Sequence, residues 1–279
     1  MTPKILCDGF AFLEGPRWHD GVLWVSDMHG DAVFKISLDG SYEKVMDVPE
    51  QPSGLGWLPN GDMLIVSMLD KKLLRRKPDG KVSEHADVSA LVPRRINDMI
   101  VDTLGRAWVG NFGFLFDEGE PPASTVLVRV DPDGSYHFAA DNLMFPNGMV
   151  ITDNGKTLVV AETFGRKLTA FDIDEDSILS NRRTWAEMPE SAVPDGICLD
   201  AEGGIWVASP TTGEALRFVE GGEVTNSVQT GRMAIATALG GEDGKTLFVL
   251  TSESTSRKEC CDAASARVEY VPVDVGAAV

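Results

Sequence analysis

The chain alternates short apolar runs with turn-forming residues, and almost every apolar run is too short to form a helix. In residues 145–161, a Pro-Asn-Gly sequence opens one apolar strand, and an Asp-Asn-Gly turn leads into a second. Such turn residues between two apolar runs are a strong signal for a β-hairpin. The pattern therefore predicts a succession of hairpins and no helical segment of useful length.

Variants of this hairpin occur six times along the chain. Further short strands lie between them, each followed by an Asp-Gly or similar turn and a polar strand, which makes about four strands per repeat. Repeats of roughly 40 to 50 residues with four antiparallel strands are typical of propeller blades. The aligned positions of the six repeats are Gly15, Gly54, Asp98, Gly148, Gly196 and Ala236.

The repeats predict an all-β fold, a six-bladed β-propeller with four antiparallel strands per blade. We expect a single domain spanning residues 1–279, because the repeats use the whole chain. Residues 4–7 are expected to add a strand to the last blade, which would close the ring and hide two sheet edges.

Polar residues mark the beginnings of several first strands, which lie innermost in a propeller and therefore meet at one mouth of the central channel. Glu14, Asn147 and Asp195 hold this position in repeats one, four and five. Their oxygen atoms are hard donors that suit Ca²⁺, Mg²⁺ or Mn²⁺, and two neighbouring buried carboxylates need a compensating charge. Each residue alone is explained by a turn, but the three together predict a divalent-cation site.

Composition places the chain among ordinary globular proteins, with 43% hydrophobic and 24% charged residues. Its net charge of −18 argues against nucleic acid or an anionic membrane as a partner. The beginning of the chain has no signal-peptide pattern, and the cysteines lack zinc-type spacing, so we expect a cytoplasmic protein with free thiols. These cysteines are Cys7, Cys198, Cys260 and Cys261. The sequence contains no Gly-x-Ser-x-Gly, dinucleotide-binding, P-loop or EF-hand motif.

Four segments resemble the signature segments of the gluconolactonase / senescence-marker-protein (regucalcin) family. These are residues 12–18, 95–98, 145–148 and 193–196, and the resemblance extends over nearly the whole chain. It implies a six-bladed propeller that binds one divalent metal ion at the channel mouth and hydrolyses lactones. The metal ligands of the family correspond to Glu14, Asn147 and Asp195, and its substrate-contacting residues to Arg95 and Asn97. We expect Ca²⁺ first, with Mg²⁺, Mn²⁺ or Zn²⁺ as alternatives.

The resemblance implies a metal-dependent lactonase acting on a small sugar lactone or another small lactone or ester. In this hypothesis metal-activated water attacks the carbonyl, and Asp195 is the general base. Two alternatives use the same residues: an organophosphate or ester hydrolase with Asp195 as nucleophile, and a calcium-binding propeller without turnover. Asp98 is expected to face away from the mouth, because side chains alternate along a strand. The sequence leaves the oligomeric state open.

The ends of the second strands should form the rim of the mouth, and they differ from a set suited to sugars. We expect Asn111 and Phe112 to contact substrate. Phe112 and Phe114 either make the pocket more apolar or only pack within the loop. The insert at residues 114–124 lengthens the third repeat at this face and is either a lid or an inert surface insertion.

Overall fold

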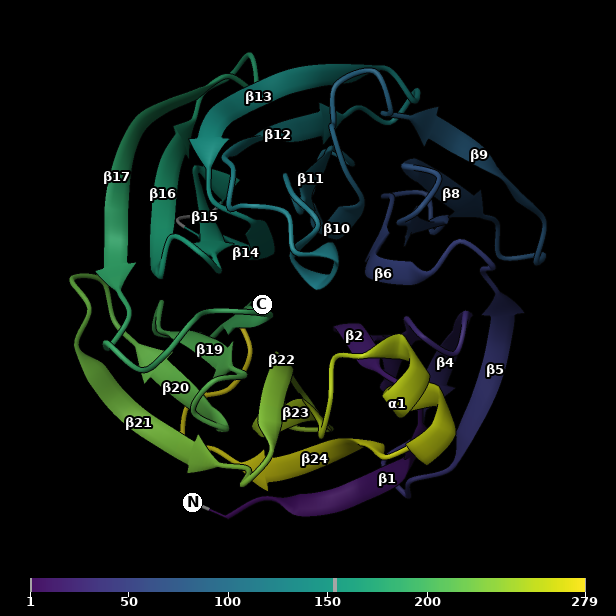
Figure 1. The fold of residues 1–279 in the computed structure, drawn as a ribbon, viewed down its shortest axis with the longest axis vertical. Helices are drawn as coiled ribbons and strands as arrows, with labels where there is room; N and C mark the ends of the chain where they lie inside the picture. Colours follow the sequence, from purple (N-terminus) through teal and green to yellow (C-terminus); the bar gives the residue numbers. More distant parts are fainter. Residues whose placement is uncertain (1, 153–154, 279) are drawn as a thin grey trace.

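Six four-stranded antiparallel sheets stand around a central channel in the computed structural model (Figure 1). The structure describes residues 2–152 and 155–278. The predicted six-bladed β-propeller is confirmed. The Asp153 and Asn154 positions of the hairpin turn lie outside the described residues.

In the first five blades the strands follow chain order from the channel outward. The first three blades consist of β2 (Leu13–His19), β3 (Val22–Asp27), β4 (Ala32–Ile36) and β5 (Tyr42–Asp47); β6 (Pro52–Trp57), β7 (Met63–Ser67), β8 (Lys72–Arg76) and β9 (Val82–Asp87); β10 (Ile96–Val101), β11 (Ala107–Asn111), β12 (Thr125–Val130) and β13 (Tyr136–Leu143). The fourth and fifth consist of β14 (Pro146–Thr152), β15 (Thr157–Glu162), β16 (Lys167–Ile173) and β17 (Leu179–Glu187); β18 (Ile197–Leu199), β19 (Ile205–Ser209), β20 (Glu214–Phe218) and β21 (Val224–Gln229).

The sixth blade combines both ends of the chain. It consists of β22 (Met233–Gly240), β23 (Thr246–Ser252), β24 (Ala266–Pro272) and β1 (Lys4–Phe10), with β1 outermost. The predicted closing strand is confirmed, since Lys4 pairs with Tyr270 in an antiparallel register. As a result β24 is paired on both sides, and β1 forms the outer edge of the blade.

Two short helices interrupt the strands in the part of the chain that the structure describes. The 3₁₀-helix η1 (Phe116–Glu118) lies in the insert of the third blade, and α1 (Arg257–Ala263) lies between β23 and β24. The apolar pattern did not predict α1, because seven residues with one buried side chain, Cys260, give no helical periodicity. None of the described helices is long and apolar enough to cross a membrane.

Apolar side chains between neighbouring sheets form the core, and the innermost strands meet so closely that they need glycine. A Cβ atom on Gly148 would lie 2.5 Å from the backbone nitrogen of Ile197, and one on Gly196 would lie 2.3 Å from the Cβ of Ala236. Asn147 and Gly148 are part of β14 itself. The repeated X-Gly pair is therefore a packing position beside the channel, and the interpretation of Asn147-Gly148 as a simple turn is wrong.

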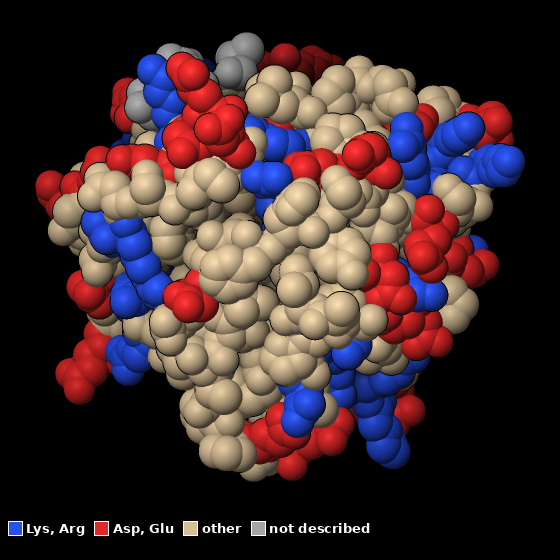
Figure 2. Space-filling model, turned by 90° about the horizontal axis from the view of Figure 1, so that it is seen from above, with Lys and Arg blue, Asp and Glu red and all other residues tan. Residues whose placement is uncertain are grey.

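The charged residues are spread over the outer wall. On the face that Figure 2 shows, Asp and Glu side chains are scattered, with Lys and Arg side chains among them and uncharged surface between. Many charged side chains of the molecule form ion pairs between adjacent strands, such as Lys35 with Glu43 and Lys72 with Glu84. The negative charge is therefore not collected into one acidic patch on this face.

Candidate functional site

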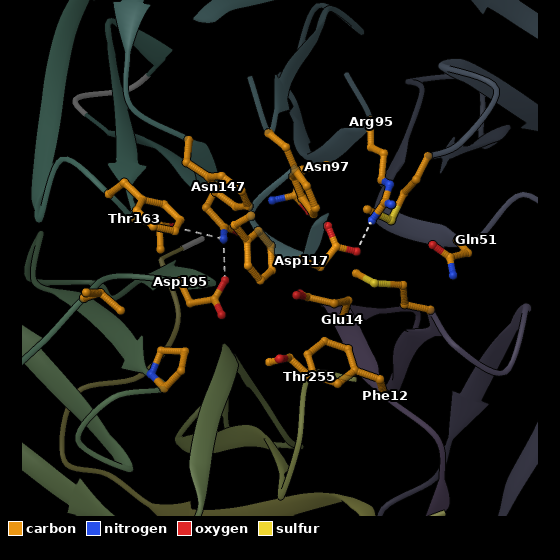
Figure 3. Close-up of a pocket in the computed structure, with 18 of the residues that line it drawn as sticks. Phe12, Glu14, Gln51, Arg95, Asn97, Asp117, Asn147, Thr163, Asp195 and Thr255 are labelled. Carbon is orange, nitrogen blue, oxygen red and sulfur yellow. Dashed lines mark hydrogen bonds and ion pairs between the residues drawn. The ribbon is translucent and has the colours of Figure 1, made fainter. Parts of the chain in front are cut away.

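A cavity of about 200 Å³ opens at the mouth of the central channel (Figure 3). All six blades contribute to its lining, the sixth through Thr255, which precedes α1. Ends of second strands form part of the rim, as predicted, and they contribute Met28, Phe112, Thr163 and Pro210. The cavity is therefore built from residues far apart in the sequence that the propeller brings to one place.

Five buried polar side chains from five blades line this cavity. They are Glu14 on β2, Gln51 just before β6, Asn97 on β10, Asn147 on β14 and Asp195 just before β18. The predicted metal ligands and the predicted substrate-contacting asparagine thus lie in the same cavity. The backbone nitrogen of Asp195 donates to the carbonyl oxygen of Ala208 on β19 at 3.0 Å, which fixes this residue although it lies outside a strand.

A repeated irregularity of the inner strands positions these side chains. Pro146 pairs with Glu162 and the next pair is Met149 with Val160, so β14 has one residue more than β15 between the two pairs. The same extra residue occurs in β2 between Glu14 and Arg17, and in β10 between Ile96 and Met99. Such bulges bend a strand and re-aim its side chains, often beside active sites.

Asn147 is the centre of the hydrogen bonding in the cavity. Its Nδ2 atom donates to Oδ1 of Asp195 and, at 3.2 Å, to Oγ1 of Thr163 (Figure 3). Its Oδ1 atom is buried and accepts no hydrogen bond. An unpaired buried acceptor costs about 1–3 kcal/mol, so this oxygen marks a place where a positive or hydrogen-bonding group is expected.

Burial raises the pKa values of both carboxyl groups in the cavity. The pKa of Glu14 lies well above its ordinary value because of burial, with smaller contributions from the charges of Asp195 and Asp98. Burial raises the pKa of Asp195 to about 8, and the charge of Asp98 acts in the same direction, while the hydrogen bond from Asn147 opposes them. Burial and the nearby charge of Asp98 therefore both disfavour ionisation of Glu14 and Asp195.

The donors in the cavity fit a hard cation. Two carboxyl groups without a directly bonded cationic partner, and an amide oxygen without a hydrogen bond, are the oxygen donors that Ca²⁺ and related ions prefer. Within residues 2–152 and 155–278, no three side chains of His, Cys, Asp or Glu form a metal-binding group. A cation here would therefore depend on amide oxygens in addition to Glu14 and Asp195.

Asp98 lies beside this set with a partner of its own. Its Oδ1 atom accepts a hydrogen bond at 2.8 Å from Arg17 on β2 and another from its neighbour, the backbone nitrogen of Met99. Arg17 also donates to the carbonyl oxygen of Met99. Asp98 does not line the cavity. It influences Glu14 and Asp195 through its charge.

The insert of the third blade lies against Arg95. The guanidinium of Arg95 donates to Asp117 at 2.8 Å (Figure 3) and to Glu118 at 3.2 Å. Both partners belong to η1. Arg94 forms a second, two-bonded pair with Glu120. Arg95 lines the cavity as predicted, but its donors already bind the insert.

The two predicted rim contacts differ in position. Phe112 lines the cavity and stacks on Phe145, with ring centroids 4.3 Å apart. Asn111 is fully buried, and its side chain bonds Val126, Gly113 and Thr125 within its own blade. The structure does not bring Asn111 to the cavity, because the side chains of adjacent residues alternate across the strand.

Several cavity residues were not predicted as site residues. Asp117 and Phe116 come from the insert, where only the length of the insert signalled a role. Gln51 and Val193 precede first strands, two residues before the position that holds Glu14, Asn147 or Asp195 in its repeat and at the position that holds Arg95. Alignment of the repeats extended by two residues toward the N-terminus would have found these two. Thr255 lies outside any repeat signal.

Fold and site together define a six-bladed propeller with a cavity rich in oxygen atoms at one channel mouth. The family described as "SMP-30/Gluconolactonase/LRE-like region" matches residues 12–253. The chain belongs to this family, and the resemblance drawn from the sequence is confirmed.

Related proteins agree with this assignment. The chain is 27% identical to the pentonolactonase XacC of Haloferax volcanii over 86% of this chain and 81% of that protein. A gluconolactonase structure from Xanthomonas campestris is 25% identical, with a TM-score of 0.77 over 96% of this chain and 88% of that one. A regucalcin structure from Agrobacterium tumefaciens, described as a calcium-binding protein, has a TM-score of 0.83 over 99% and 95% of the two chains at 20% identity, and supports the fold. The prediction of an enzyme of the lactonase class agrees with the names of the first two relatives.

Proposed function

We propose that this protein is a divalent-metal-dependent lactonase that opens a small lactone to the hydroxy acid. The observation that carries the proposal is the buried set at the channel mouth, two carboxyl groups and the unpaired Oδ1 of Asn147, in a chain that belongs to a family with lactonase members. The pentonolactonase and gluconolactonase names of its relatives support the substrate class.

Glu14, Asn147 and Asp195 would hold the metal ion, with Ca²⁺ as the first candidate. Mg²⁺, Mn²⁺ and Zn²⁺ are the alternatives, because an oxygen-rich site of this kind does not select strongly among them. When bound, the cation would polarise the lactone carbonyl and stabilise the negative charge that develops on its oxygen.

Asp195 is the proposed general base. In its ionised form it accepts a proton from the attacking water as the water oxygen bonds to the carbonyl carbon. When the ring C–O bond then breaks, the same carboxyl returns the proton to the leaving oxygen. The hydrogen bond from Asn147 to Oδ1 orients the carboxylate and favours its ionised form.

Asn97 is a proposed contact to the substrate. It lines the cavity, and its Oδ1 atom accepts a hydrogen bond from Oγ of Ser53 at 3.3 Å, which orients the amide. The proposed contribution of Arg95 is to hold the insert over the cavity through Asp117 and Glu118.

The test is a panel of small lactones and esters assayed with the purified protein before and after chelation. We expect hydrolysis that is lost on chelation and restored by a divalent cation. The Asp195→Asn variant should lose turnover by a factor of about 10² to 10⁴, the usual contribution of a general base. Glu43→Gln, on the outermost strand of the first blade and 67% exposed, is the matched control and should retain it.

Two results would contradict the proposal. Undiminished hydrolysis after complete chelation would remove the metal from the mechanism. The absence of hydrolysis with every cation added would instead favour a calcium-binding propeller without turnover.

A further inference from the structure

Five phenylalanine side chains from the third and fourth blades form one connected cluster at the cavity. Phe145 stacks on Phe112 at 4.3 Å, and Phe164 lies 5.3 Å from Phe145 and 4.8 Å from Phe114, measured between ring centroids. Phe116 of the insert joins the cluster at 5.7 Å from Phe145. All except Phe114 line the cavity. We call this set the phenylalanine cluster.

Two members of the phenylalanine cluster keep part of their rings exposed at the cavity. Phe116 is 40% exposed and Phe164 is 42% exposed, while Phe112, Phe114 and Phe145 are buried. Covering exposed aromatic surface with an apolar group removes it from water and lowers the free energy of the complex. The exposed faces of these two rings therefore favour a ligand with apolar surface.

The side of the cavity contributed by the first, second and fifth blades is also largely apolar. Phe12 and Met28 come from the first blade, Met68 from the second, and Val193 and Pro210 from the fifth. The polar groups Glu14, Asn97 and Asn147 come from the inner strands that line the central channel, and Asp195 lies just before the inner strand β18. A ligand would thus find the oxygen atoms of this polar set at one end and mostly apolar side chains around the remainder, where Gln51, His29 and Thr255 are polar exceptions.

Beside the phenylalanine cluster, the cavity has few free donors for the hydroxyl groups of a sugar. The guanidinium of Arg95 is bound to Asp117 and Glu118, and Thr163, which accepts a hydrogen bond from Asn147, has one O–H left to donate. A hydroxyl group placed against the phenylalanine cluster would lose its water and find no partner, which weakens binding.

We propose that the cavity selects lactones whose ring carries an apolar alkyl or aryl substituent over polyhydroxylated lactones. The ring would lie against the polar set of the channel, and the substituent against the phenylalanine cluster. This proposal rests on the proposed lactonase function for its chemistry. The selectivity itself rests on the shape and composition of the cavity walls.

The test compares kcat/KM along a series of δ-lactones that carry hydrogen, methyl, propyl, pentyl or phenyl, together with glucono-δ-lactone. Burial of one methylene group is expected to raise kcat/KM about fourfold until the cavity is filled. A higher kcat/KM for glucono-δ-lactone than for the pentyl and phenyl compounds would overturn the proposal.

Binding is measured in parallel with the corresponding lactams, whose amide bond resists hydrolysis, so that selectivity is tested without turnover. Tighter binding of the pentyl lactam than of a polyhydroxylated lactam would support the selectivity even if no lactone were hydrolysed, and only the lactonase function would then fail. Hydrolysis with preference for the sugar lactone would overturn the selectivity and leave the lactonase function intact. Lack of binding by every lactam, together with lack of hydrolysis, would overturn both.

Variants of the two half-exposed rings locate the effect. Phe116→Ser and Phe164→Ser should each reduce the ratio of pentyl to unsubstituted kcat/KM by about tenfold. Phe138→Ser is the matched control, because Phe138 is 56% exposed on the outer strand β13, outside the cavity lining. An unchanged ratio in both cavity variants would contradict the assignment of the substituent to the phenylalanine cluster.

Discussion

The side-chain amide of Asn147 donates a hydrogen bond to Asp195 across the boundary between the fourth and fifth blades, and the Oδ1 atom of the same amide is buried without a partner. The two residues lie close because their neighbours Gly148 and Gly196 allow the innermost strands to approach each other. One amide thus fixes a carboxyl group with its nitrogen and presents a free acceptor with its oxygen. This division of roles makes Asn147 the residue through which the cation hypothesis is tested most directly.

Replacement of Asn147 by Asp should lower the stability of the protein without metal and increase the stabilisation that a bound cation provides. The variant keeps the shape but cannot donate to Asp195 when ionised, and it adds a third carboxyl group to a buried cluster. We expect a loss of about 1–3 kcal/mol without metal, which lowers the melting temperature by about 2–4 °C per kcal/mol in a chain of this size. Calcium should raise the melting temperature of the variant more than that of the wild type.

Thermal denaturation in chelator and in excess calcium measures this difference, with Glu43→Gln as the control for a surface carboxyl group. An equal calcium effect in wild type and in Asn147→Asp would contradict the assignment of Asn147 as a ligand.

Cation binding should release protons and strengthen with rising pH. The pKa of Asp195 is raised to about 8 and that of Glu14 is also raised, so that protons compete with a cation near neutral pH. Below about pH 8, apparent affinity should fall by up to about tenfold per pH unit for each proton displaced. Calorimetric titration in buffers of different ionisation enthalpy counts the protons released. An affinity independent of pH between 6 and 8 would be inconsistent with carboxyl ligands of raised pKa.

The same pKa shifts determine how stability without metal depends on pH. A carboxyl group with a pKa raised in the folded state binds more protons there than in the unfolded state, between its unfolded value and the raised one. Because of Asp195, the free energy of unfolding therefore falls as pH rises from about 4 to about 8. In chelator, the difference in melting temperature between Asp195→Asn and wild type should grow in favour of the variant over this interval, and saturating calcium should reduce the difference.

Asp98 and Asp195 should respond differently to the same substitution. Asp195→Asn removes the proposed base and one ligand. Asp98→Asn keeps an acceptor for the backbone nitrogen of Met99 and for Arg17. It removes a charge that raises the pKa values of Glu14 and Asp195. We expect Asp98→Asn to retain kcat within about tenfold, while Asp195→Asn loses about 10² to 10⁴. Steady-state kinetics at saturating metal distinguishes the two, and equal losses would place Asp98 in the catalytic machinery.

The blades and the central residues of the site were predictable from the sequence because both repeat. The turn residues and apolar runs recur with the blade, so Glu14, Asn147 and Asp195 could be placed at one mouth by their position in the repeat alone. The position of Asp98 depends on a bulge at Asn97-Asp98, which strict strand alternation does not include. A register shift of one residue leaves no signal in the hydrophobic pattern of so short a strand.

Features that occur once in the chain were out of reach. The ion pairs of Arg95 with Asp117 and Glu118 depend on how an insert without a counterpart in other blades folds back. Asn111 and Phe112 are adjacent, and only the exact end of β11 decides that the phenylalanine lines the cavity while the asparagine faces into its blade. Sequence patterns determine strand ends less well than strand existence.

Arg95 should act on the substrate through the insert. Loss of its bonds to Asp117 and Glu118 frees η1, and with it Phe116, from the cavity edge. We therefore expect Arg95→Gln to raise KM for lactones with apolar substituents by about tenfold, the effect of about 1.4 kcal/mol of lost binding, with little change in kcat. Because the three side chains are partly exposed, high salt should weaken the wild-type contact in the same direction.

A double-mutant cycle separates this role from direct contact with the substrate. Asp117→Asn combined with Glu118→Gln removes the partners of Arg95 and should raise KM as much as Arg95→Gln does. Addition of Arg95→Gln to that pair should then change KM no further, because the bonds are already lost. A further large rise in KM would mean that Arg95 binds the substrate itself. Arg94→Gln, which removes the bond to Glu120 at the outer end of the insert, is the control for general loosening of the loop.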